Sequence, residues 1–140
     1  MPDVVNRMVK LAQCRPHPRN YNQHSTAQLE DLRSSLRRFG QVRSIVVQAA
    51  ADGGYLLVAG HGIVAAASLE LYTELRADVI PATWSEMQVL AYLAADNELG
   101  RQSNPDIAQL AAVVATMCRR RRMRSWRVWR RAVRRGCRSC

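Results

Sequence analysis

Residues 55–71 read YLLVAGHGIVAAASLEL, and this stretch decides the fold. Four apolar or aromatic residues precede the turn Gly60-His61-Gly62, and an alanine-rich run follows it, so the order predicts a strand, a glycine turn and a helix. Glycines let the backbone approach a ligand closely, and the first amides of a helix are unpaired. The turn is therefore a candidate phosphate site, although the same two glycines could serve only the backbone freedom of a tight connection.

A helix over residues 26–39 is predicted upstream of this stretch. Ser25 and Gln28 have the spacing of a capping box, apolar residues recur at helical intervals, and Gly40 follows the last of them. The preceding residues 14–25 carry two prolines and several amides, which indicates a loop, and residues 7–12 alternate well enough for a short opening strand.

The remaining elements alternate between strands and helices. Residues 44–48 and 55–59 are separated by Asp52-Gly53-Gly54, which predicts a hairpin. Together the pattern predicts a single α/β (α+β) domain within residues 1–118. The other expected elements are a helix over 62–72, a strand over 76–83 that Pro81 limits to an edge or an end, a helix from Ser85 to about residue 99, and a last helix from Asn104-Pro105 to about residue 117.

The net charge of +10 is concentrated in one segment. Residues 119–140 contain eleven arginines and no acid, which leaves ten basic and eleven acidic residues in 1–118. Arginines and two tryptophans could form a nucleic-acid arm, in which guanidinium groups pair with phosphates and indoles stack on bases. The same mixture is also what GC-rich DNA yields when it is translated out of frame. The candidate DNA contacts in this tail are Arg119, Arg120, Arg121, Arg122, Trp126 and Trp129.

The cysteines and the apolar runs indicate a cytoplasmic protein. Four scattered cysteines without a signal peptide favour reduced thiols, and no apolar run reaches the roughly 20 residues that span a bilayer. A zinc site is not expected, because no second pair of ligands accompanies Cys14, His17 and His24 to complete a tetrahedral set. No nucleophile triad and no Walker-type lysine are present, so two large classes of enzyme lose support.

Polar residues outside the turn form a second set of candidates. Arg19 and Asn20 lie in the long loop, where Arg19 could pair with an anion, and His61 in the turn could donate to a phosphate. His24, Asp96 and Asn97 could add polar support. Each of these residues could instead be an ordinary exposed or backbone-bonded polar group.

Four motifs in this order resemble the ParB/sulfiredoxin superfamily, especially ParB-like N-terminal domains of phages and mobile elements. They are PHPRNYNQHS with its following helix, FGQVRSIVVQ, YLLVAGHG ahead of AAASLEL, and AADNEL, and the resemblance covers about residues 8–106. It implies a small α/β domain, with a small mixed sheet flanked by helices, in which a loop arginine, here Arg19, and the glycine turn converge on the phosphates of a nucleotide. The ligand is CTP in partition proteins of the family, and CTP or another nucleoside triphosphate with Mg²⁺ is the cofactor that the resemblance implies.

The same resemblance also shows departures. Ile63 stands where phage-type turns commonly carry an arginine, and isoleucine cannot neutralise a phosphate. No cysteine occurs between Val58 and Ala65, so sulfiredoxin-type reductase activity is not expected.

The expected function is therefore a nucleotide-responsive, DNA-associated module of a phage or plasmid system. It would act in partition or as a regulatory domain preceding a DNA methyltransferase, with nucleic acid, a partition or methyltransferase partner, or a second copy of the chain as its partners. The alternatives are a nucleoside triphosphatase (a CTPase, for example) that uses the same pocket, and non-specific DNA binding through the arginine-rich tail.

Overall fold

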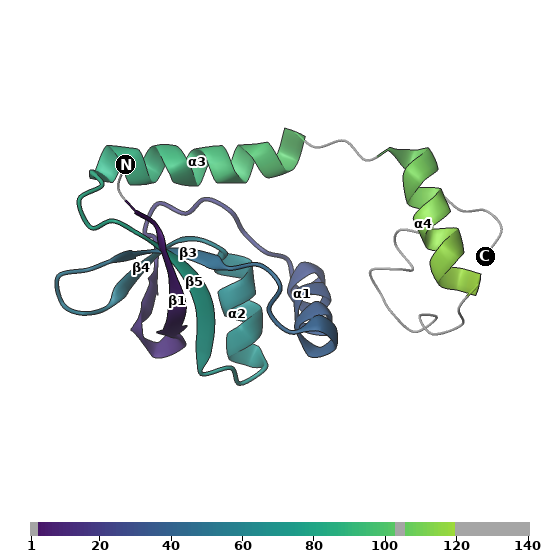
Figure 1. Cartoon of the computed structure of the whole chain (residues 1–140), viewed down its shortest axis with the longest axis horizontal. Coiled ribbons are helices and arrows are strands. Elements are labelled where there is room, and N and C mark those ends of the chain that lie inside the picture. The colour runs from purple at the N-terminus through teal and green to yellow at the C-terminus, as the bar shows by residue number, and fades with distance from the viewer. Residues whose placement is uncertain (1–2, 103–105, 120–140) are drawn as a thin grey trace. The chain divides into compact units, whose positions relative to one another are not determined.

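The computed structural model describes residues 3–102 and 106–119. The chain divides into two units, one ending at Gly100 and the other beginning at Arg101, and each is treated by itself. The first unit contains a five-stranded sheet, drawn in Figure 1, with the strand order β1-β5-β3-β4-β2. Its strands are β1 (Val5–Lys10), β2 (Cys14–Pro16), β3 (Ile45–Ala49), β4 (Tyr55–Ala59) and β5 (Glu74–Ile80).

The sheet is mixed, as the sequence predicts. β1 pairs antiparallel with β5, and β3 pairs antiparallel with β4, which confirms the hairpin around residues 52–54. β3 runs parallel to β5, and β2 runs parallel to β4. Parallel neighbours need a crossover, and here the crossovers contain helices. The helices are α1 (Thr26–Phe39), α2 (His61–Leu69) and α3 (Glu86–Gln102), with α4 (Ile107–Arg119) in the second unit.

Capping side chains define the start of two helices. The Ser25 hydroxyl accepts from the Gln28 amide at 3.1 Å, and Gly40, at φ 67°, ends α1, so the predicted helix over 26–39 is confirmed. At α3, the Ser85 amide donates to Gln88 Oε1 at 2.8 Å, and the Gln88 amide donates back to Ser85 Oγ at 3.3 Å. These bonds satisfy amides that the first turn of a helix would leave unpaired.

The core lies on both faces of the sheet. Leu57 belongs to a cluster with residues of α1 and α2, whereas its neighbour Val58 belongs to a cluster with Val89 and Leu93 of α3. Successive side chains on a strand point to opposite faces, so β4 is covered by α1 and α2 on one side and by α3 on the other. β4 therefore reads as a continuous apolar run, and burying each large side chain contributes roughly 1.5–3 kcal/mol.

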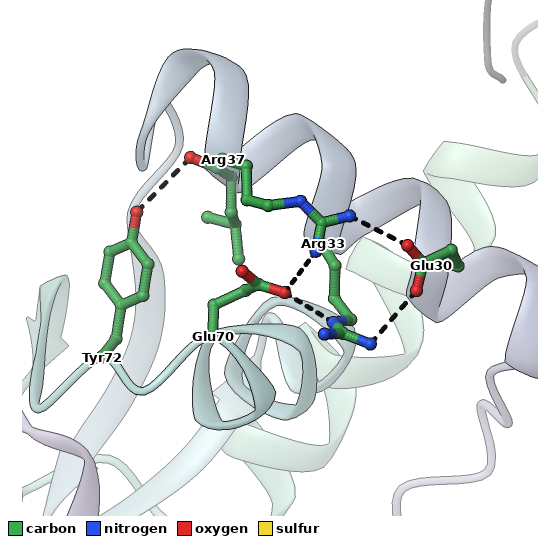
Figure 2. A network of polar contacts seen from close by, with 6 residues as sticks. Glu30, Arg33, Arg37, Glu70 and Tyr72 are labelled. Atoms are coloured by element: carbon green, nitrogen blue, oxygen red, sulfur yellow. Dashed lines mark hydrogen bonds and ion pairs between the residues drawn. The ribbon is translucent and has the colours of Figure 1, made fainter. Parts of the chain in front are cut away.

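An ion-pair network connects α1 with the end of α2, as Figure 2 shows. Glu70 accepts from Arg33 at 2.6 Å and from Arg37 at 2.7 Å, and both arginines also reach Glu30. The Tyr72 hydroxyl adds a bond to a backbone carbonyl of α1 at 3.4 Å. Since Glu70 is only 14% exposed, this pairing holds the two helices that carry one side of the core in a fixed arrangement.

The structure corrects several predicted boundaries. The opening strand is β1, Val5–Lys10, and a 3-10 turn follows it where the prediction over 7–12 continued the strand. Residues 14–16 form β2 although a loop was predicted there, because the pairing partner β4 lies 41 residues away in sequence and leaves no local signal.

Three later boundaries also differ. α2 ends at Leu69 and not at residue 72, because Leu71 takes a positive φ of 61°. β5 spans Glu74–Ile80, so it starts earlier than predicted and stops directly before Pro81. α3 continues to Gln102. Within the described residues no helix combines the length and the apolar character that crossing a bilayer requires.

Candidate functional site

The turn between β4 and α2 has a backbone that only glycine fits. Gly60 lies in the left-handed region, at φ 94° and ψ 24°, and a Cβ there would come within 2.8 Å of Ile45 Cγ2. The first intrahelical bond of α2 runs from the Val64 amide to the Gly60 carbonyl at 3.0 Å. The amides of residues 61–63 therefore have no acceptor inside the helix, and they lie at its positive end.

Side chains from the loop and from α1 partly cover this turn. A Cβ at the buried Gly62 would lie 2.8 Å from His24 Cε1 and 3.0 Å from Leu32 Cδ1. The imidazole of His24 is thus packed against the backbone of the turn. The close approach explains why glycine is needed at this second position, where φ is not positive.

A cavity of about 200 Å³ opens beside the turn. Its walls come from the loop before α1, from α1, from the turn with the start of α2, and from α3. Seven of the predicted site residues meet there: Asn20, His24, Gly60, His61, Gly62, Asp96 and Asn97. The cavity is also lined by four residues that sequence reasoning did not select, namely Asn22, Gln28, Leu32 and Ile63.

Amide side chains join the loop to α3. Asn22 Nδ2 donates to Asn97 Oδ1 at 2.7 Å, and Asn20 Oδ1 accepts from the Asn22 amide at 3.2 Å. Asn97 Nδ2 and His24 Nδ1 are buried without a hydrogen-bond partner. Buried polar atoms without partners cost free energy, so two groups at this cavity retain unused hydrogen-bonding capacity.

The three histidines of the chain gather at the turn. The His17 amide donates to His61 Nε2 at 3.2 Å, and the Arg19 amide donates to His17 Nδ1 at 3.1 Å. An imidazole nitrogen that accepts carries no proton, so neutral His61 has its proton on Nδ1. Burial, followed by the proximity of His17 and His24, lowers the pKa of His61 to about 4.

The predicted cation of the site does not line the cavity. The Arg19 side chain is exposed, and among the described residues that line the cavity there is neither a lysine nor an arginine. A neighbouring hollow of about 400 Å³ shares Gly60, Ile63 and Asp96 with the cavity and includes Arg43. The turn amides and polar side chains fit a phosphate and hydroxyl groups, but the lining lacks the permanent positive charge that a nucleoside triphosphate calls for.

Other candidate chemistry finds no support in the described part of the chain. No three histidine, cysteine or carboxylate side chains converge there as a metal site. Cys14 is a half-buried free thiol on β2, and burial raises its pKa. Arg119 is the last described residue, and its side chain is not described; the tail residues Arg120, Arg121, Arg122, Trp126 and Trp129 lie outside the described residues.

Comparisons with known proteins agree with this fold. Residues 4–96 match the model of the ParB N-terminal domain family. A search of the curated proteins finds no significant match.

Solved structures give the same result. The chain is similar to the C-terminally truncated chromosome-partitioning protein ParB from Caulobacter crescentus complexed with CTP-gamma-S, with a TM-score of 0.71 and 21% identity over 81% of this chain and 62% of that one. The same protein complexed to the centromeric parS site gives a TM-score of 0.50 and 21% identity over 79% of this chain and 56% of that one. Sulfiredoxin from Arabidopsis thaliana gives a TM-score of 0.50 and 17% identity over 64% of this chain and 97% of that one. The chain therefore spans less than two thirds of the partition protein it matches.

Proposed function

Because the chain belongs to the ParB N-terminal domain family, we propose that it is a nucleotide-responsive module of a DNA-transaction system. The nucleotide would bind in the cavity beside the Gly60–Gly62 turn. One observation carries the proposal: the start of α2, whose first amides have no acceptor inside the helix, lines a cavity that polar side chains of the loop, α1 and α3 complete. The solved partition protein with the same fold is described as a complex with CTP-gamma-S, so CTP is the first nucleotide to test.

The residues of the cavity would take different parts of the ligand. The amides of the turn, together with His61 and Asn20, would contact phosphate oxygens, while His24, Asp96 and Asn97 would bind hydroxyl or base groups. Arg19 would act from outside the cavity, since its exposed side chain follows directly after the part of the loop held by His17. Mg²⁺ would enter with the phosphates of the nucleotide, as it does in most nucleotide sites.

Calorimetry with CTP, ATP and GTP in the presence of Mg²⁺ tests the proposal. We expect one of them to bind, with affinity reduced several-fold in Arg19→Ala and more strongly in Asn20→Ala. Arg38→Ala, on α1, is the matched control for loss of an arginine, because Arg38 does not line the cavity. If none of the three nucleotides binds to the folded protein, the proposal is wrong.

Hydrolysis is the alternative use of the same pocket. A nucleoside triphosphatase would release phosphate at a rate that exceeds the uncatalysed reaction and that falls in Arg19→Ala. Binding without phosphate release leaves the module as a responsive binding domain and excludes this alternative.

The proposed role in DNA transactions concerns the system in which the chain would work. A member of this family could act in phage or plasmid partition, or as a regulatory domain preceding a DNA methyltransferase, and it could work as a homodimer. The arginine-rich residues 119–140 offer a direct electrostatic contact with DNA. Affinity for DNA should then fall steeply with salt, and deletion of residues 119–140 should abolish it. Unchanged binding after the deletion would exclude the tail as the contact.

A further inference from the structure

The charge balance of the cavity does not match that of a phosphate. Of the described residues that line it, only Asp96 carries a permanent charge at neutral pH, and that charge is negative. The start of α2 contributes about half a positive charge. A ligand with one or more phosphates therefore needs a positive charge that the free protein does not place in the lining.

One lining residue, His61, is placed to acquire that charge. His24 and His61 both line the cavity, and the His17 amide donates to His61. His61 Nε2 is occupied by the His17 amide, whereas its Nδ1 has no hydrogen-bond partner among the described residues. In the free protein His61 is therefore a neutral ring that can offer one N–H to a ligand.

The surroundings of His61 explain why its charge is absent without a ligand. Burial and the neighbouring His17 and His24 disfavour its protonated form, which places its pKa at about 4. Asp96 lines the cavity from α3, whereas Arg43 does not line the cavity and belongs to the neighbouring hollow. An anion within about 4–6 Å favours the charged form and typically raises a pKa by roughly 1–3 units. A bound phosphate would thus reverse the effect that keeps the ring neutral.

We propose that this cavity binds its phosphate-bearing ligand together with a proton, which the imidazole of His61 accepts, so that the positive charge arises only on binding. The inference rests on the proposed function and adds a regulation to it: affinity rises as the pH falls, by up to about tenfold per pH unit for each proton taken up. The proton would go to His61 Nε2, which then no longer accepts from the His17 amide. Binding therefore also releases the start of the loop from the turn.

Nuclear magnetic resonance of the histidine side-chain nitrogens in the 140-residue chain tests this directly. Inorganic sulfate is the first probe, because it stays a dianion between pH 5 and 8 and adds no titration of its own; CTP is the second. We expect the free protein to show His61 in its Nδ1–H form, and either probe to raise the titration midpoint of His61 by roughly 1–3 pH units. Midpoints that stay fixed while CTP binds would overturn the inference and leave the proposed function standing. Absence of binding by both probes at every pH would overturn both.

Variants separate this role from a purely structural one. In His24→Gln/His61→Gln the cavity keeps polar side chains but cannot take up the proton, so CTP affinity should become independent of pH between 5.5 and 8 once the titration of free CTP is subtracted. His17→Asn is the matched control: it removes the remaining histidine, keeps an acceptor for the Arg19 amide, and should retain the pH dependence. Circular dichroism checks that each variant is folded. A double variant that keeps the full pH dependence would contradict the inference.

Discussion

Replacement of Gly60 by alanine should destabilise the protein through two separable effects. At φ 94°, any residue with a Cβ is strained, which costs roughly 1–2 kcal/mol. The new Cβ would also lie 2.8 Å from Cγ2 of Ile45, which is fully buried, and overpacking of a core typically costs about 1–3 kcal/mol. The sum predicts a loss of roughly 2–5 kcal/mol in the free energy of unfolding, a large part of the stability of a domain of this size.

Gly53 provides the matched control for this experiment. It has a similar φ of 84°, but a Cβ there would meet nothing within 4 Å, so Gly53→Ala should show the backbone strain alone. Urea unfolding followed by far-ultraviolet circular dichroism gives both free energies, and a shifted midpoint with an unchanged slope would identify a change in stability. Equal losses in the two variants would refute the close contact between the turn and β3 as a source of the effect.

Three further predictions concern the ion pairs, the histidines and the tail. Glu70→Gln should lower the free energy of unfolding by about 1 kcal/mol, because the partly buried Arg33 loses a charged partner. Glu30→Gln changes a more exposed carboxylate and should lower the free energy of unfolding less. A larger effect of Glu30→Gln in urea unfolding would contradict this order. Because the folded pKa of His61 lies below its usual value, neutral His61 stabilises the protein above pH 6.5, and this contribution is lost as the pH falls toward 4. The contribution is about 1–2 kcal/mol once solvent screening is taken into account. Unfolding measured across this pH range should show the loss of stability in the wild type, and the same loss in His61→Gln would assign it to another group. Deletion of residues 120–140 should leave the midpoint of thermal unfolding of the remaining chain unchanged, and calorimetry showing a clear decrease would mean that the tail contributes to the fold.

Local sequence signals were sufficient for most of the fold. The capping spacing at Ser25 and Gly40 predicted α1 to the residue, and the apolar run before Gly60 predicted β4 and the start of α2. These features are encoded within a few residues, where propensity and capping act. β2 was missed because only its parallel pairing with β4 makes it a strand, and three residues that include a proline carry no periodicity.

Most of the candidate residues selected from the sequence line one cavity, but the expected arginine does not. The glycine turn, the loop amide Asn20 and the Asp96-Asn97 pair all meet there. Asn22 was not selected, although its position two residues after Asn20 fits the local side-chain to backbone bonds that asparagines form in turns. The direction of the Arg19 side chain could not be inferred, because it depends on how the loop folds back on His61.

The short strand β2 has a consequence for how this domain can change. It fixes the beginning of the loop to β4, the strand that leads into the glycine turn, while the packing of α1 on α2 fixes the loop's other end. Both anchors thus belong to the two elements on either side of the turn. Because closing a somewhat longer loop between fixed ends costs little, residues 18–24 can be lengthened or replaced without displacing the scaffold, and new ligand preferences can be introduced there by exchanging one short peptide segment.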